Sequence, residues 1–216
     1  MATDLAIVIG HRESAQGAVA VDGTTEWQMH QWTARALEDA VESFGWRVKT
    51  VLRDDTPQGL DALAQKVDTY GALAAVSLHF NSFGKPSALG GDAGDWDGYG
   101  IPNECDDDAD GDGDLDRHEA HGCEMLCARG SRRGHELASG LQAASLSSLR
   151  GVRSRGVKQI GRGGRGWKFL RCRPVAVLME PFFGSNPRDL AVWYRDREAW
   201  VREVAIVLSN FLSGLE

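Results

Sequence analysis

The sequence predicts a single α/β domain, with a twisted, mostly parallel or mixed central sheet flanked by helices and with one irregular acidic insert. Short apolar runs typical of buried strands alternate along the chain with longer segments whose apolar residues recur every three or four positions, as on one face of a helix. The 216 residues are enough for one compact domain with its own core. Between Gly84 and Gly122 both periodicities stop, which indicates an insert rather than a further layer of the domain.

The first half of the chain contains three expected strands and two expected helices. Leu5–Ile9 is a short apolar run and is predicted to be a buried strand. Glu26–Phe44 has its apolar residues at helical spacing and is followed by a glycine, which is typical of a helix end. Arg47–Leu52 is the second predicted strand, and Gly59–Thr69, with one apolar stripe, is the second helix. Ala72–Leu78 is an apolar run between a glycine and a histidine, and it is predicted to be a third strand.

The second half continues the alternation. Cys123–Cys127 is predicted to be a strand and Ser131–Leu149 a long helix. Arg150–Gly166 is rich in glycine and arginine and is expected to be a loop. Val175–Met179 is a further apolar run and is expected to be a buried strand. The last helix lies within Pro187–Leu215, where leucine, valine and tryptophan residues share one face.

Side chains able to bind a metal or move a proton follow three of the buried strands. His11, His79 and Glu180 come at the ends of three apolar runs. In open α/β sheets, functional sites collect at the carboxyl ends of the strands, so we expect these side chains to lie together. Glu26 opens the first helix and is a further candidate, although a carboxylate there also suits the helix dipole. Two imidazoles and a carboxylate are a common catalytic zinc set, whereas any single strand can end at a polar residue without a functional reason.

Five short motifs resemble those of the zinc-dependent N-acetylmuramoyl-L-alanine amidases of the type 3 class, and they come in the order of that family. They are IVIGHRESAQGAVAVDGTTEW, SLHFNS, HGCEMLC, RSRGVK and VAVLMEPFFGSNPRD. The resemblance covers nearly the whole chain outside the insert. It implies that His11, Glu26 and His79 bind zinc, that Glu180 is the catalytic carboxylate, and that Asn81 of the second motif binds substrate. Residues 1–83 and 122–216 would then form the catalytic domain, and residues 84–121 the insert.

The implied reaction is hydrolysis of the amide between N-acetylmuramate and L-alanine in peptidoglycan. Zinc lowers the pKa of bound water toward about 7 and polarises the scissile carbonyl. Glu180, at the end of an apolar strand, would take a proton from the water and deliver it to the leaving amine. Two alternatives stay open: a zinc peptidase that cuts the stem peptide with the same metal ligands, and a calcium-dependent, non-catalytic module that binds the cell wall. The presence of Glu180 argues against the module.

Charge and hydropathy restrict the partners and the place of action. Twelve acidic residues and one basic residue lie between Asp92 and Glu119, so this segment carries −11, and the rest of the chain carries +4 against a total of −7. A mildly basic body suits an anionic polymer such as a cell wall, and it also suits an ordinary solvated surface. The sequence has no basic stripe interleaved with aromatic residues, the pattern that would indicate nucleic-acid binding. No run reaches the roughly 20 apolar residues that span a bilayer.

The N-terminal residues suggest where the protein is made. They lack the basic and long apolar regions of a secretory signal, so we expect synthesis in the cytoplasm. Action on the cell wall would then follow release by a holin-type, pore-forming partner, as for a compact phage endolysin. The four cysteines form no CxxC pair and are expected to be reduced thiols.

Four further residues have two interpretations each. Arg162 and Arg165 in the GRGGRGW segment would line a groove for an anionic glycan–peptide, or belong to a plain flexible loop. Trp167 would stack on a sugar, or pack in the core. His30, on the first helix, is expected to be a packing or surface residue and not a metal ligand.

The acidic insert contains a complete EF-hand calcium loop, DADGDGDLDRHE, that begins at Asp108. Gly113 stands at the sixth position, where the loop turns sharply, and Glu119 stands at the twelfth, where a glutamate binds through both oxygens. The preceding DWDGYGIPNECD resembles the aspartate-rich repeats of thrombospondin type 3. The expected calcium ligands are Asp95, Asp97, Asp106, Asp108, Asp110, Asp112, Asp114 and Glu119. The alternative is a solvated acidic loop without a bound ion.

Calcium is therefore expected to raise the melting temperature of the protein, because an ion that binds only the folded form stabilises it by mass action. The increase should disappear in the triple variant Asp108→Ala/Asp110→Ala/Glu119→Ala, and magnesium should substitute poorly because it prefers smaller octahedral sites. Calorimetric titration and thermal melts with and without chelator measure both effects. A melting temperature that is indifferent to calcium and to chelator would leave only the solvated acidic loop.

Overall fold

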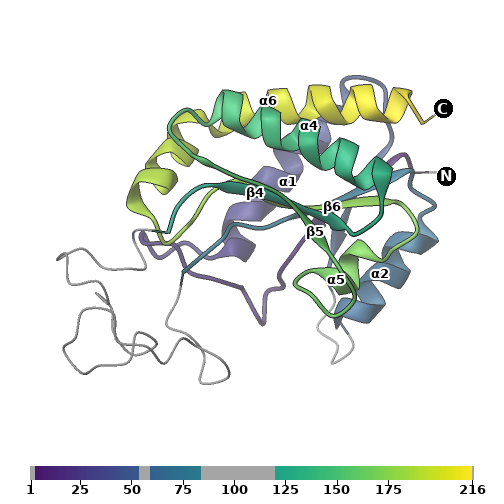
Figure 1. The fold of residues 1–216 in the computed structure, drawn as a ribbon, viewed down its shortest axis with the longest axis horizontal. Coiled ribbons are helices and arrows are strands. Elements are labelled where there is room, and N and C mark those ends of the chain that lie inside the picture. Colours follow the sequence, from purple (N-terminus) through teal and green to yellow (C-terminus); the bar gives the residue numbers. More distant parts are fainter. Residues whose placement is uncertain (1–2, 54–58, 84–119, 216) are drawn as a thin grey trace.

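A six-stranded sheet between two layers of helices forms the computed structural model of this chain (Figure 1). The structure describes residues 3–53, 59–83 and 120–215, and the side chains of residues 59–61 are not among them. The expected calcium ligands, Asp95 to Glu119, therefore lie outside the described residues. The architecture confirms the predicted α/β class with a mixed sheet.

The strands are arranged in the order β2-β1-β3-β6-β4-β5. Their bounds are β1 Leu5–Ile9, β2 Val48–Leu52, β3 Ala74–Leu78, β4 Cys123–Ala128, β5 Ser154–Ile160 and β6 Val175–Glu180. The four strands β2, β1, β3 and β6 run parallel, β4 pairs antiparallel with β6, and β5 pairs parallel with β4. Every residue of β1 and β3 is buried, which explains why both read as continuous apolar runs.

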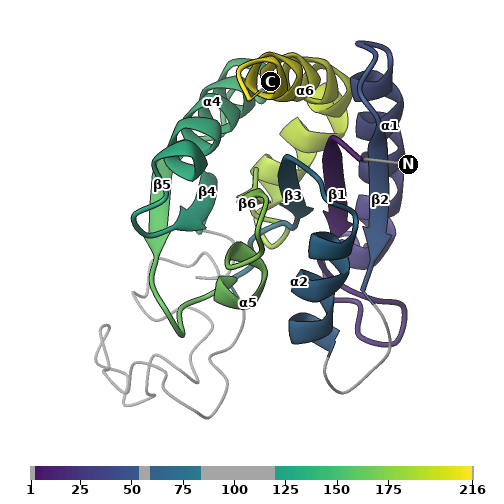
Figure 2. The same cartoon turned by 90° about the vertical axis from the view of Figure 1, so that its right-hand side faces the viewer.

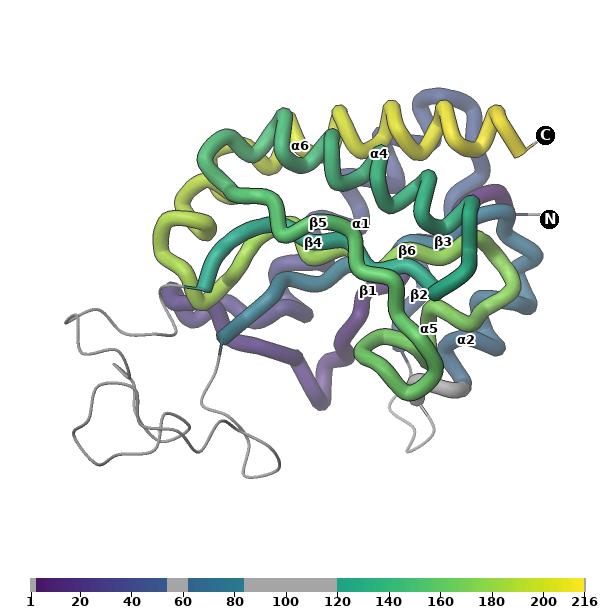
Figure 3. The backbone as a smooth tube through the Cα atoms, viewed as in Figure 1, coloured from purple at the N-terminus to yellow at the C-terminus, as the bar shows by residue number. Residues whose placement is uncertain are grey.

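Helices cover both faces of the sheet (Figure 2). One face carries α1 Glu26–Glu42, α4 Arg132–Ser148 and α6 Pro187–Ser213, and the other carries α2 Gly59–Thr69 and the short α5 Trp167–Leu170. The larger layer buries the bulkiest side chains, among them Trp193 and Trp200, and the indole N–H of Trp200 donates to Ser145 Oγ at 2.8 Å. The segment between β5 and β6 passes through α5 on the same side of the sheet as α2 (Figure 3). Among the described helices, none is both long and apolar enough to span a membrane.

A capping box fixes the start of α1. The Thr25 hydroxyl accepts from the Gln28 N–H at 3.2 Å, and the Gln28 side chain accepts from the Thr25 N–H at 3.0 Å. This pair satisfies two donors that a helix end leaves open. It also holds Glu26 in the first turn of the helix, with its side chain directed into the protein.

One predicted element is wrong: the segment 150–166, expected to be a loop, contains the strand β5. Its sequence, SRGVKQI, is polar because β5 is an edge strand that pairs only with β4 and needs no continuous apolar run. Gly156 adopts φ +80° where the register with β4 shifts by one residue. A glycine at such an irregularity is what made the segment resemble a loop. The other predicted elements are confirmed, with ends that differ by a few residues.

Candidate functional site

The residues at the carboxyl ends of the strands β1, β3 and β6 lie at the same level of the sheet. Ile9 pairs with Leu78, and Leu78 with Met179, in the parallel ladder β1-β3-β6. The ladder continues by one step, because the Gly10 N–H donates to the Leu78 carbonyl at 3.2 Å and the next N–H on β3 donates to the Met179 carbonyl at 3.0 Å. Gly10, His79 and Glu180 therefore lie side by side at the carboxyl ends of three adjacent strands.

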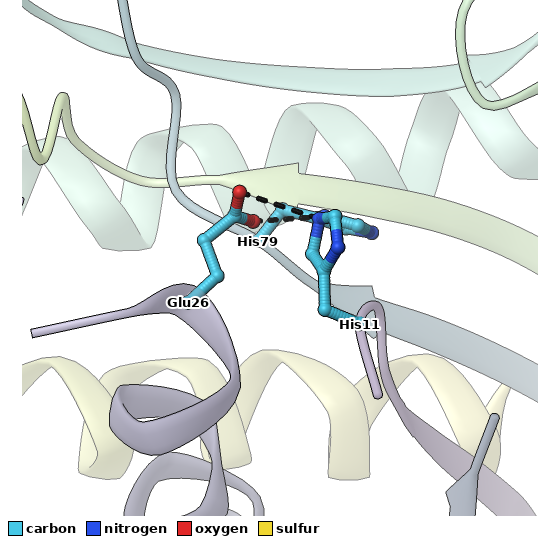
Figure 4. A group of neighbouring side chains, drawn as sticks. All are labelled: His11, Glu26 and His79. Atoms are coloured by element: carbon cyan, nitrogen blue, oxygen red, sulfur yellow. Dashed lines mark hydrogen bonds and ion pairs between the residues drawn. The ribbon is translucent and has the colours of Figure 1, made fainter. Parts of the chain in front are cut away.

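His11, Glu26 and His79 converge just beyond this row (Figure 4). Their potential ligand atoms all lie within 4.8 Å of one another. Glu26 Oε1 is 3.3 Å from His11 Nε2, and Glu26 Oε2 is 3.0 Å from His79 Nδ1. The two imidazole rings stand edge to face with centroids 5.1 Å apart. Two imidazole nitrogens and a carboxylate in this arrangement fit a zinc ion, with further coordination positions left for water or substrate.

The Glu26 carboxylate is held in place and kept ionised. Burial alone would raise its pKa, but the neighbouring His11 and His79 lower it well below its usual range. The backbone N–H of Ala18 donates to Oε1 at 2.9 Å, and that of Phe80 donates to Oε2 at 3.3 Å. Such backbone contacts orient a metal-binding side chain before the metal arrives.

Each imidazole lies against a glycine. A Cβ atom built on Gly10 would come within 2.0 Å of the His79 ring, and one built on Gly17 would come within 2.6 Å of the His11 ring. Gly17 also adopts φ +82°, a conformation that other residues rarely take. Close packing against backbone therefore fixes the position of both rings.

His30 lies behind the site and is not one of the convergent groups. Its ring is 1% exposed, and burial lowers its pKa to about 3, so the ring is neutral. Neither ring nitrogen has a hydrogen-bond partner among the described residues. Its burial confirms the packing role expected from the sequence.

Two buried carboxylates, Glu180 and Glu124, face each other across the antiparallel pair β4-β6. Burial raises the pKa of Glu180 to about 8, against the opposing effect of Arg165. Burial also acts to raise the pKa of Glu124, but Arg165 and Arg155 outweigh it and lower that pKa. The pair thus combines one carboxyl group that readily carries a proton with one that stays ionised, an arrangement typical of acid–base sites.

Arg165 bridges the two carboxylates. Its Nη2 contacts Glu124 Oε1, and its Nη1 is 3.2 Å from Glu180 Oε2. Glu180 Oε2 receives no hydrogen bond among the described residues, so the second contact is an ion pair only. Glu124 also accepts from Arg155 Nε at 3.2 Å and from the Asn81 amide at 3.1 Å.

Glu124 is the site residue that sequence reasoning missed. It stands between Cys123 and Met125 in an otherwise apolar strand, and its side chain is 4% exposed. A charged residue inside a buried run is costly unless it is paired, and this was the available signal. Its two arginine partners come from the strand β5 and the loop after it, a segment that the sequence predicts to be a loop, so the pairing was not expected.

A cavity of about 790 Å³ is bordered both by His11, Glu26 and His79, here called the triad, and by Glu180. Asn81 also lies in its wall. Arg162, Arg165 and Trp167 also line it, which places the GRGGRGW segment on the wall of this cavity. A concave space with convergent polar groups and a carboxyl group of raised pKa has the features of an enzyme active site.

A family model described as N-acetylmuramoyl-L-alanine amidase (Amidase_3) matches residues 5–206. Several solved structures are similar in fold. The CwlD amidase from Clostridioides difficile, solved in complex with the GerS lipoprotein, has a TM-score of 0.68 at 16% identity, over 99% of this chain and 98% of that one. The catalytic domain of the CD27L endolysin, which targets Clostridia difficile, has a TM-score of 0.68 at 18% identity, over 98% of this chain and 97% of that one.

A third similar structure comes from another bacterium. The amidase Ami1 from Mycobacterium smegmatis has a TM-score of 0.66 at 14% identity, over 99% of this chain and 98% of that one. At such identities these likenesses establish the shared fold. No curated protein sequence shows significant similarity to the chain.

The glycine contact at His79 yields a prediction. Gly10→Ala should displace the His79 ring, because the new methyl group would overlap it, and should therefore weaken metal binding by the triad. Gly10 has no left-handed φ, so the substitution adds no backbone strain of its own. Gly214→Ala, at the end of α6 with contacts no closer than 3.5 Å, is the matched control. Titration of both variants with zinc measures the effect, and equal affinities would contradict it.

Proposed function

The chain belongs to the N-acetylmuramoyl-L-alanine amidase family, and from this premise we propose that it hydrolyses the amide between N-acetylmuramate and L-alanine in peptidoglycan with the aid of zinc. The observation that carries the proposal is the convergence of His11, Glu26 and His79, whose ligand atoms lie within 4.8 Å of one another beside the cavity that holds Glu180. These three side chains would hold the metal. A zinc ion in such a site supplies a Lewis acid and a water that ionises near neutral pH.

Glu180 is the proposed proton carrier. Its carboxyl group borders the same cavity, and its pKa of about 8 lets it exist in both protonation states near neutral pH. In the ionised form it accepts a proton from the attacking water, and in the protonated form it donates one to the leaving nitrogen of L-alanine. Glu124 is unsuited to this task because Arg155 and Arg165 keep it ionised.

The products of digestion test the proposal directly. An amidase releases stem peptides whose first residue is L-alanine with a free amino group, and leaves the glycan strand intact. A peptidase with the same metal ligands would release fragments cut within the stem, and a non-catalytic binding module would release nothing. Mass spectrometry of digested sacculi separates the three outcomes, and only the first supports this function.

Three finer features are also proposed; the first two are supported by the sequence alone, and the third also by the position of Asn81. Residues 84–121 would bind calcium in a structural role. The enzyme would act in phage lysis, made in the cytoplasm and acting on the cell wall after a holin-type partner releases it. Asn81, which lines the cavity and donates to Glu124, would contact substrate.

His79→Ala is expected to abolish both stoichiometric zinc and peptidoglycan hydrolysis, since it removes one of three ligands. Elemental analysis of the purified protein and release of free amino groups from sacculi measure the two effects. His135→Ala, at an exposed position of α4, is the control and should keep both. Full zinc occupancy in His79→Ala would remove this residue from the site.

Glu180→Gln is expected to retain zinc and to lower turnover by on the order of a hundredfold or more, because the amide cannot accept the proton. Its stability should behave differently. The folded protein raises the Glu180 pKa from 4.5 to about 8, so ionisation destabilises the metal-free fold as pH rises through this window. Glutamine does not ionise, so the variant does not lose stability in this way. Thermal melts of the metal-free proteins should thus show the stability of the variant rising relative to that of the wild type between pH 5 and pH 8, whereas a constant difference would contradict the assignment.

A further inference from the structure

Arg165 lies where two cavities meet. A second cavity, of about 910 Å³, runs along the edge strand β5. It shares Asn81, Ser82 and Arg165 with the cavity that holds the triad. The scissile amide of the proposed substrate joins a glycan to a peptide, so a site for it needs two spaces that meet at the reacting bond. The inference that follows rests on the proposed function.

The described lining of the second cavity is cationic. Within the parts of the chain that the structure describes, its ionisable lining residues are Arg153, Arg155, Lys158, Arg165 and Glu124. Four positive charges against one negative give a net charge of +3, and the one carboxylate already pairs with Arg155 and Arg165. A concave surface of this charge favours an anionic ligand. A stem peptide with free carboxylates has that chemistry, whereas the neutral sugar backbone does not.

Glu124 orients both arginines toward the cavity. Arg155 donates through Nε to Glu124 Oε2 at 3.2 Å, and its guanidinium lies over the Phe183 ring at 4.9 Å. Arg165 keeps 50% of its side chain exposed although it contacts Glu124 and Glu180. A guanidinium has five N–H donors, and among the described residues only Glu124 receives a hydrogen bond from that of Arg165. The exposed donors are thus pre-oriented for a further carboxylate.

The spacing between the scissile amide and the next carboxylate of the stem peptide fits the position of Arg165. Arg165 Nη1 is 3.2 Å from Glu180, the proposed proton carrier at the scissile amide. The carboxylate of the second stem residue lies about 7 Å beyond that amide in an extended chain, roughly two residue lengths. In peptidoglycan this residue is a glutamate linked through its side chain, so its α-carboxylate is either free or amidated.

We propose that Arg165, anchored by Glu124, binds the free α-carboxylate of the second stem residue, and that the enzyme therefore prefers stem peptides in which this group is not amidated. A carboxylate accepts two hydrogen bonds from the planar guanidinium and neutralises its charge. A carboxamide brings N–H donors against a donor-only group and carries no charge. The preference arises at the site that carries out the reaction, so it affects the rate as well as binding.

The test uses two soluble disaccharide peptides that differ only in a free or an amidated α-carboxyl group on the second residue. The full-length, zinc-loaded wild type should cleave the free acid with a kcat/KM about tenfold to a hundredfold higher, the range expected for a hydrogen bond to a charged group. Arg165→Gln also removes the ion pair with Glu180, so it should slow cleavage of both substrates, but that of the acid by a larger factor, and the ratio of the two kcat/KM values should fall toward one. Arg133→Gln on α4 is the matched control, since that arginine is also 50% exposed and lines neither cavity, with an ion pair to Glu136 and a hydrogen bond to the Gly214 carbonyl as its contacts.

The outcomes separate this inference from the function on which it rests. Equal cleavage of both substrates by the wild type, or an equal slowing on both in Arg165→Gln, overturns the carboxylate contact and leaves the amidase function standing. The second result would assign Arg165 only to the positioning of Glu180. Absence of any amide cleavage, in these substrates and in sacculi, overturns the proposed function and the inference with it.

Discussion

The common register of three parallel strands is the constraint on which the site depends. Because β1, β3 and β6 are paired without offset, the residues that follow them, Gly10, His79 and Glu180, stand next to one another. A slip of one residue in β3 or β6 would turn the side chain of His79 or Glu180 to the opposite face of the sheet. The buried apolar runs that make the register unique thus position the polar groups as well. Core packing and site geometry are two consequences of the same hydrogen-bond ladder.

The ends of this ladder are secured by a further buried carboxylate. Asp189, 2% exposed in the first turn of α6, accepts from the Gly122 N–H at 2.7 Å and from the Phe183 N–H at 3.0 Å. The first of these donors precedes β4 and the second follows β6. A single side chain therefore holds the entry to one strand against the exit from its neighbour, and keeps Glu124 opposite Glu180. Two backbone hydrogen bonds to one buried carboxylate thus rigidify this side of the site.

How much the sequence could predict depended on whether a residue follows a buried run. His11, His79 and Glu180 do, and the structure brings them together with Glu26 as expected. The partners of Glu180 could not be found in this way. Glu124 lies inside an apolar strand, and its arginine partners come from an edge strand and loop whose polar composition gives no periodic signal. Pairing across strands is a non-local property, and a single sequence contains no direct record of it.

Three glutamates in this small region differ only in their surroundings. Glu26 sits between two imidazoles, Glu124 between two guanidinium groups, and Glu180 in a largely apolar strand end with one ion pair. The first two environments favour the charged carboxylate, and the third favours the protonated one. In the proposed function these surroundings would suit Glu26 to bind a metal, Glu124 to anchor the two arginines and Glu180 to carry a proton. Burial and neighbouring charges would then separate the roles of three residues of the same type.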